Sequence, residues 1–112
     1  MVVVVHIVGG VGSMLLKRVF CNCYLTGTAR LILSLYYCGC CSVEELSRLA
    51  CMLPGQVAKL LSTLTVSGIA RACGSDRYCL SPSGASEARR IIRDLKTVVA
   101  LLEGVERGDA SL

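Results

Sequence analysis

The apolar residues between positions 42 and 50 recur at the spacing of one helical face. Residues three or four positions apart lie on the same side of a helix, so this pattern predicts an amphipathic helix. Ser42 stands at its start and Glu45 follows three residues later, which is the sequence of a capping box. The apolar positions are Val43, Leu46, Leu49 and Ala50.

A second helix is expected over residues 54–67. Pro54 suits its first turn, because the fixed φ of proline matches a helix and the missing N–H is not needed there. Gly68 is expected to end this helix in the left-handed conformation. One apolar stripe runs along the helix and consists of Val57, Leu60, Leu61 and Leu64.

Two short strands are expected after the second helix, over residues 69–73 and 77–81. Gly74, Ser75 and Asp76 separate them and are residues typical of a tight turn. Two helices joined by a short turn and followed by a hairpin make up the plan of a winged helix. We therefore predict a winged helix-turn-helix fold that is mostly α, with a small β-hairpin wing.

Two more helices are expected before this unit, over residues 14–24 and 29–38. Thr26 and Gly27 separate them, and Gly39 ends the second. The residues before position 14 include a β-branched run, 2–8, in which His6 is the only polar member. We expect residues 1–13 to form a strand or a flexible extension. His6 is then either an ordinary residue on a strand face, or it acts as a metal ligand or proton carrier.

Ser81 and Pro82 are a cap and a first-turn proline for a last, long helix. It is predicted to end at Gly104, so that the winged-helix domain covers residues 14–104 and 105–112 form a tail. A small core with a wing can cover only part of the apolar stripe of so long a helix. We therefore expect a homodimer that buries this dimerisation helix through Ala88, Ile91, Ile92, Leu95, Val98, Val99 and Leu102.

The stretch 29–92 resembles the winged-helix transcriptional regulators of bacteria and archaea, of the MarR, PadR and ArsR kinds. These families often end the recognition helix with L-x-x-x-G-[LI], and often open a dimerisation helix with a leucine, a Thr or Ser, and Pro. Both motifs occur here, as Leu64, Gly68 and Ile69, and as Leu80, Ser81 and Pro82. They are structural motifs, and winged helices also serve as protein-binding modules.

The resemblance implies that helix 54–67 enters the major groove of double-stranded DNA. Glutamine can pair with adenine, and lysine can reach guanine or phosphate, so the exposed polar residues are expected at the base edges. Flanking arginines are expected at phosphates, with Arg77 on the wing. The alternative is that the whole set is a solvated surface. The set consists of Arg48, Gln56, Lys59, Ser62, Thr63, Arg71 and Arg77.

Composition narrows the classes of function. The 112 residues are 54% hydrophobic, which is enough for one domain with a sizeable core. A net charge of +4 permits nucleic acid as a partner without requiring it. The chain has no Trp and one Phe, so a platform that stacks single-stranded bases is not expected. With one His and scattered acidic residues, neither an enzyme nor a small-molecule substrate is expected.

The longest stretch without a formal charge, residues 1–16, is shorter than a membrane-spanning helix and contains three glycines. It also lacks the positive charge that precedes the apolar run of a secretory signal. We therefore expect a cytoplasmic protein that does not bind a membrane.

Eight cysteines allow three interpretations, which the sequence leaves open: buried reduced thiols, structural disulfides, or a metal- or redox-sensing site. If a disulfide forms, Cys73 and Cys79 on adjacent hairpin strands are the expected pair. Thiolates suit zinc or another thiophilic metal. The paired C-x₂-C spacing of a zinc ribbon is absent, so no metal site or other cofactor is predicted. The other cysteines near a C-x-C pattern are Cys21, Cys23, Cys38, Cys40 and Cys41.

Three functions therefore compete. The first is a dimeric, sequence-specific regulator that binds duplex DNA through helix 54–67. The second is a winged-helix module that binds another protein through its last helix. The third adds metal or redox sensing by the cysteines to the first.

Overall fold

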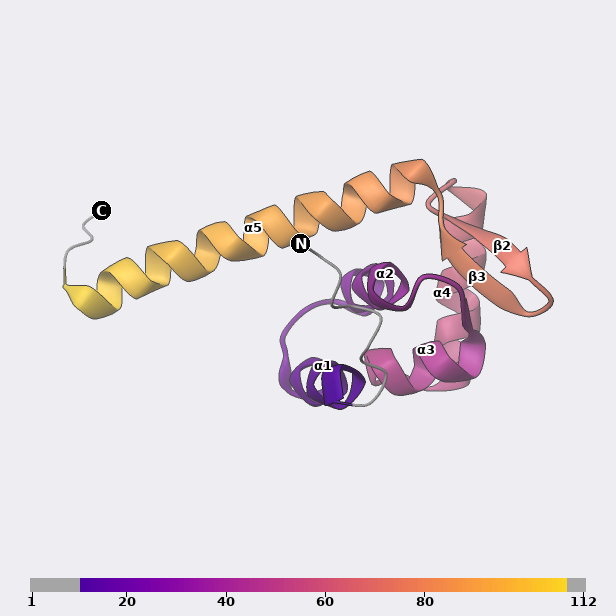
Figure 1. The fold of residues 1–112 in the computed structure, drawn as a ribbon, viewed down its shortest axis with the longest axis horizontal. Helices are drawn as coiled ribbons and strands as arrows, with labels where there is room; N and C mark the ends of the chain where they lie inside the picture. The colour runs from indigo at the N-terminus through magenta and orange to yellow at the C-terminus, as the bar shows by residue number, and fades with distance from the viewer. Residues whose placement is uncertain (1–10, 109–112) are drawn as a thin grey trace.

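The computed structural model describes residues 11–108, which form helices and one small antiparallel sheet (Figure 1). The predicted strand at 2–8, with His6, and the last residues of the predicted tail lie outside this range. The elements are α1 (Val11–Asn22), α2 (Gly27–Cys38), β1 (Cys41–Ser42), α3 (Val43–Ala50), α4 (Pro54–Val66), β2 (Ala70–Gly74), β3 (Arg77–Leu80) and α5 (Pro82–Arg107).

Local capping sets the ends of the central helices. The Thr26 hydroxyl accepts a hydrogen bond from the Ala29 N–H at the start of α2. The predicted capping box of α3 is present: Ser42 Oγ accepts from the Glu45 N–H at 3.1 Å, and Glu45 Oε1 accepts from the Ser42 N–H at 2.9 Å. These bonds satisfy backbone donors that the first turn of a helix leaves without partners.

The α3–α4 unit is a helix-turn-helix. Pro54 opens α4 as predicted, and the two helices are bent by 107° at the break between them. Gly68 has a φ of +81°, and the Ile69 N–H donates to the Leu64 carbonyl at 2.9 Å. The predicted left-handed end of this helix is therefore confirmed.

The sheet has three strands in the order β1-β3-β2, where the sequence predicted a two-stranded hairpin. The added strand, β1, pairs Cys41 with Tyr78 and Ser42 with Arg77. Two residues are too few to show a strand periodicity, which is why the sequence did not reveal it. A β-bulge lies between Ala72 and Gly74, so β2 forms an irregular outer edge of the wing.

The core lies between α2, the helix-turn-helix, the sheet and the first turns of α5. Leu31, Leu35, Leu46 and Val57 are its largest fully buried apolar side chains. Ala88 is the residue of α5 that enters this cluster. The hydrophobic stripes that predicted the separate helices therefore converge on a single core.

Helix α5 is longer than predicted. It runs through Gly104 and ends at Arg107, where Gly108 adopts a φ of +81°. A glycine inside a helix costs only about 1 kcal/mol relative to alanine, so the residues after Gly104 can continue the helix. The C-terminal half of α5 projects beyond the rest of the domain (Figure 1).

Within residues 11–108, no single helix is both long and apolar enough to cross a membrane. Helices α3 and α4 meet those criteria only when taken together across their 107° bend.

Candidate nucleic-acid interface

Helix α4 presents one apolar and one polar face. Val57, Leu61 and Leu64 are buried in the core. The four residues that the sequence assigned to DNA on this helix all lie on the exposed side: Gln56, Lys59, Ser62 and Thr63. The rotation of α4 therefore agrees with the predicted stripe, while the contacts of these residues with DNA stay a prediction.

Two of these four side chains already have backbone partners, in the helix or at its N-cap. Gln56 Oε1 accepts from the Leu53 N–H at 3.1 Å, and Thr63 Oγ1 donates to the Lys59 carbonyl at 3.3 Å. A glutamine needs both its oxygen and its nitrogen to read adenine, so Gln56 would have to release its cap. Of these four side chains, Lys59 and Ser62 have no hydrogen bond or ion pair to another described residue.

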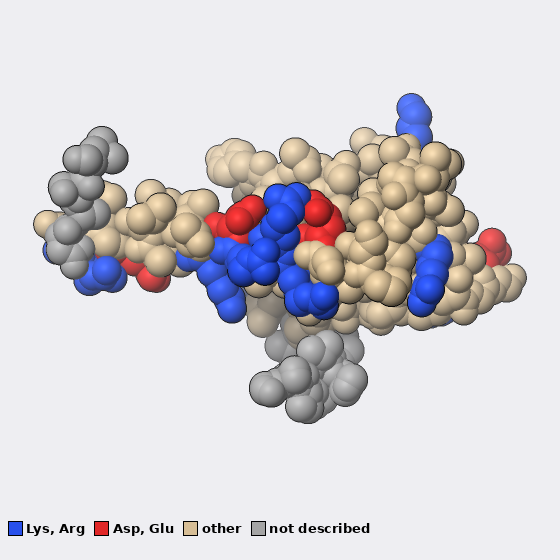
Figure 2. Space-filling view, turned by 90° about the horizontal axis from the view of Figure 1, so that it is seen from above, with Lys and Arg blue, Asp and Glu red and all other residues tan. Residues whose placement is uncertain are grey.

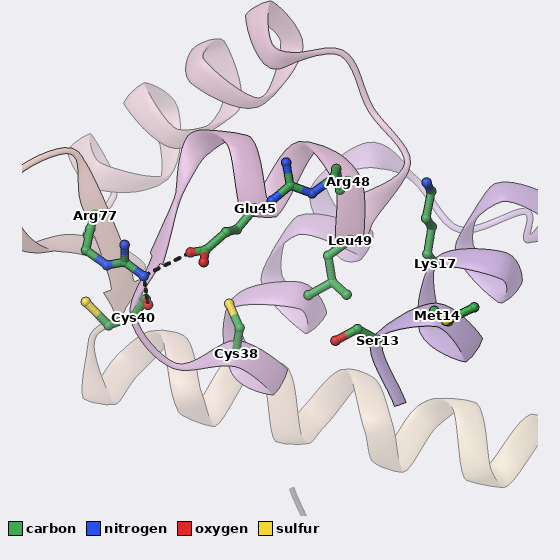
Figure 3. Close-up of a pocket in the computed structure, with 9 residues that line it drawn as sticks. All are labelled: Ser13, Met14, Lys17, Cys38, Cys40, Glu45, Arg48, Leu49 and Arg77. Carbon is green, nitrogen blue, oxygen red and sulfur yellow. Dashed lines mark hydrogen bonds and ion pairs between the residues drawn. The ribbon is translucent and has the colours of Figure 1, made fainter. Parts of the chain in front are cut away.

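The wing carries less free positive charge than the sequence suggested. Arg77 donates to Glu45 Oε1 at 2.9 Å and to the Cys40 carbonyl at 3.2 Å, which holds it at the base of the wing (Figure 3). The turn at the tip contains Asp76, with a φ of 57°. Arg71 on β2 is the exposed wing cation that has no ion pair within the described chain.

The Glu45 carboxylate links α3 to the wing electrostatically. Its hydrogen bond from the Ser42 backbone N–H holds the pKa of Glu45 below its usual value, and the nearby Arg77 and Arg48 guanidinium groups lower it further. The ionised form of Glu45 therefore stabilises both the start of α3 and the position of Arg77.

A hollow of about 620 Å³ lies beside this ion pair (Figure 3). Three cationic side chains line it, each from a different element: Lys17 of α1, Arg48 of α3 and Arg77 of β3. The structure thus brings two predicted DNA residues, Arg48 and Arg77, together here and leaves Lys59 on α4. Sequence reasoning missed Lys17, because the packing of α1 against α3 is a long-range contact without a local signal.

Six of the eight cysteines form disulfides. The Cα–Cα distance is 5.3 Å for Cys21–Cys51 and 6.2 Å for both Cys38–Cys41 and Cys40–Cys73. Cys23 and Cys79 are free. Of the three interpretations left open by the sequence, the disulfide one therefore describes most of the cysteines.

The predicted bridge between Cys73 and Cys79 is wrong. The register of the hairpin places Arg71, not Cys73, opposite Cys79, and Cys73 lies in the bulge beyond it. A diagonal pair of this kind is farther apart than two residues directly opposite each other. Cys73 instead reaches the segment before β1 and bonds to Cys40.

The disulfides also bear on metal binding. Between residues 11 and 108, no group of three or more His, Cys, Asp or Glu side chains is placed to hold a metal ion. A cysteine in a disulfide cannot serve as a thiolate ligand, so in this state the C-x-C pairs do not offer a metal site.

The long apolar stripe of α5 is divided between the subunit's own core and its surface. Ala88 is fully buried and Ile91 packs against the core, so the prediction that Ala88 contacts a second subunit is wrong. Ile92 and Leu95 are half-buried. Farther along the helix, five apolar residues are more than half exposed: Val98, Val99, Leu101, Leu102 and Val105.

The opposite face of α5 carries mixed charges, visible as neighbouring blue and red side chains along the helix (Figure 2). Arg90 forms ion pairs with Glu87 and Asp94, which raise the pKa of Arg90 above its usual value. Because these charges are of both signs and partly paired with each other, this face of α5 is not a basic patch.

The fold is similar to two solved structures. Ligand-free NadR aligns with a TM-score of 0.65 at 18% identity, over 82% of this chain and 71% of that one. A MarR family transcriptional regulator from Silicibacter pomeroyi DSS aligns with a TM-score of 0.54 at 22% identity, over 88% and 80%. The predicted winged-helix, MarR-like fold is therefore confirmed. No protein-family model and no curated protein sequence matches this chain.

Proposed function

We propose that this protein is a transcriptional regulator that binds duplex DNA as a homodimer and inserts α4 into the major groove. The outward face of α4 supports the proposal most directly, because it is polar and follows the turn of a helix-turn-helix. Lys59 and Ser62 project from it without partners in the described chain. The two similar structures share this fold, and one of them is a MarR family transcriptional regulator. The proposal includes no catalysed reaction and no bound cofactor.

The distribution of charge sets how strong such binding can be. Arg48, Lys59 and Arg71 are exposed and have no ion pair within residues 11–108. A dimer would present these cations twice, enough for about six phosphate contacts. Six contacts correspond to a loss of affinity of about 10³-fold between 50 and 200 mM salt. The electrostatic contribution to DNA affinity is therefore expected to be larger for a dimer than for a monomer.

The apolar end of α5 supports the homodimer. The stripe that is buried at Ala88 and partly buried at Ile91 continues to Val98, Leu102 and Val105, which stay more than half exposed. Apolar side chains in one continuous stripe gain free energy when they leave water. A second copy brings an identical stripe, and a two-fold axis allows both stripes to cover each other.

The decisive experiment for the DNA site compares Lys59→Ala with the wild-type protein on duplex DNA from the upstream region of its own gene. The expected result is a loss of affinity of about tenfold, with an unchanged thermal unfolding curve. Arg93→Ala is the matched control, since it removes an exposed cation from α5 and should leave the affinity unchanged. Equal affinities of the Lys59 variant and wild-type protein would contradict the proposal.

The dimer is tested by Leu102→Glu, followed by sedimentation. The variant places a charge in the apolar stripe and should be monomeric at concentrations where the wild-type protein is dimeric. Thr97→Glu is the control, because it adds the same charge on the polar side of α5. A wild-type protein that sediments as a monomer at all concentrations would rule out the homodimer.

A second candidate function is supported by the wing. Arg77 is engaged by Glu45, and the tip carries Asp76, so the wing offers Arg71 alone to a phosphate backbone. This charge distribution is compatible with a protein-binding module whose α5 packs against a different protein. A monomer without salt-dependent binding to duplex DNA would favour this candidate over the first.

A further inference from the structure

Of the elements in the proposed DNA surface, wing strand β2 has few attachments to the rest of the domain. It lies at the outer edge of the sheet and pairs with β3 on one side only. Its residues from Arg71 to Gly74 are exposed. The start of β2 is held by its pairing with β3 and by Ala70, which is buried in the core. The end of β2 at the bulge, where the pairing is irregular, depends more on a further attachment.

The covalent attachment of β2 is the Cys40–Cys73 disulfide. Cys73 lies in the bulge, two residues beyond Arg71, and Cys40 lies between α2 and β1, so the bond joins the end of β2 to the body of the domain. The other contacts at this place, from Arg77 to Glu45 and to the Cys40 carbonyl, hold β3 and not β2. We call the Cys40–Cys73 bond the wing clamp.

The wing clamp is open to attack by a thiol. Cys40 and Cys73 are both exposed, whereas Cys41 of the Cys38–Cys41 bond is fully buried. Cys40 also lines the hollow, together with Lys17, Arg48 and the Arg77–Glu45 ion pair (Figure 3). Arg77 donates to the Cys40 carbonyl at 3.2 Å. A positive side chain near a cysteine stabilises its thiolate, which favours Cys40 as the leaving group of the pair.

We propose that the wing clamp is a redox switch of DNA binding: its reduction by a dithiol releases β2, displaces Arg71 and weakens the complex. In the first step a thiolate of the dithiol attacks Cys73 Sγ, and Cys40 leaves as a thiolate. In the second step the other thiol of the reagent attacks the mixed disulfide and releases Cys73. Two electrons and two protons pass to the cysteines, and the dithiol becomes a disulfide. This inference rests on the proposed function, because DNA affinity is its output.

Two measurements test the switch independently. The first is hydrogen exchange of the β2 amides, which does not involve DNA. In Cys40→Ser/Cys73→Ser, these amides should exchange at least tenfold faster than in the wild-type protein, while those of α2 and α4 stay protected. The matched control is Cys21→Ser/Cys51→Ser, which removes a different disulfide and should not affect β2. Unchanged exchange in β2 would overturn the proposal.

The second measurement is DNA affinity in the disulfide-bonded and dithiothreitol-reduced states. Reduction of the wild-type protein should lower affinity about tenfold, and reoxidation should restore it. Arg71→Ala should lower the affinity of the disulfide-bonded protein and remove most of the effect of reduction. Equal affinities in the two states, with faster exchange in β2, would overturn the switch.

Alkylation of the partly reduced wild-type protein keeps the test valid if the serine variants do not fold. Mass spectrometry should find Cys40 and Cys73 modified before Cys38 and Cys41, in a protein that retains its helical circular dichroism. Modification in the reverse order would contradict the exposed position of the wing clamp. If β2 is released on reduction but neither state binds DNA, the proposed function fails while the clamp itself is supported.

Discussion

The replacement of Gly84 by alanine probes the contact between α5 and the residues that follow α4. Gly84 lies in the first turn of α5 and is buried against Ile69, which follows α4. A Cβ at this position would lie 2.1 Å from the Ile69 carbonyl oxygen and 3.0 Å from Leu80 Cδ2. The nearest atom is backbone, so a side-chain rotation cannot relieve the overlap.

The cost follows from the movement that is needed. A carbon and a carbonyl oxygen approach to about 3.3 Å, so the first turn of α5 would have to retreat by about 1.2 Å. This movement would stretch the bond from the Ser81 N–H to the Ile69 carbonyl, now 2.9 Å, which is worth about 1 kcal/mol. Overpacking adds about 1–3 kcal/mol, and the better helix propensity of alanine returns about 1 kcal/mol. The net destabilisation is about 1–3 kcal/mol.

The assay is thermal and urea unfolding of Gly84→Ala beside Gly55→Ala. Gly55 lies in α4, and a Cβ there would meet no atom within 4 Å. The same substitution should therefore stabilise the protein by up to about 1 kcal/mol at Gly55 and destabilise it at Gly84. For a domain of this size, Gly84→Ala should lower the melting temperature by about 5–20 °C.

The refuting result is a Gly84→Ala protein that is as stable as the wild type or more stable. In that case α5 would not pack closely against Ile69. The position of α5 relative to the helix-turn-helix, as described above, would then be wrong.

Three further substitutions have defined outcomes. Leu46→Ala empties a fully buried position and should cost about 2–5 kcal/mol in urea unfolding. Arg30→Met removes the donor to the Ala50 and Cys51 carbonyls, at 3.1 and 3.2 Å, and should cost about 1–3 kcal/mol in the same assay. Glu45→Gln tests the lowered pKa of Glu45. The ionised carboxylate stabilises the folded protein fully at pH values above its unfolded-state pKa of 4.5, and this stabilisation is lost as the pH falls through the lower pKa of the folded state. Wild-type stability should therefore fall more steeply than that of Glu45→Gln below about pH 5, by under 1 kcal/mol because the side chain is half exposed.

Elements with a local signal were predicted closely. The capping box of Ser42 and Glu45, the start of α4 at Pro54 and the left-handed Gly68 all depend on residues within one or two turns. The apolar stripe of α4 also indicated which face would be exposed, and therefore where Lys59 and Ser62 would lie. Capping and helical periodicity act between near neighbours, so the sequence alone contains them.

Features that join distant parts of the chain were missed or wrongly assigned. Cys73 bonds to Cys40 rather than Cys79, because a bulge shifts its place in the hairpin. Arg77 binds Glu45, which is 32 positions away, so its role as a free wing cation could not be judged from the sequence. The burial of Ala88 likewise depends on how α5 docks on the core.

The amino-acid sequence alone was enough to predict a winged helix, the boundaries of its central helices and the polar face of α4. These depend on propensity, capping and periodicity, which are interactions within a few residues. Only the tertiary structure decided which cysteines pair, which cations stay free and how much of the α5 stripe remains uncovered. Those outcomes depend on distances between elements, and small differences in register or docking change them without altering any local pattern.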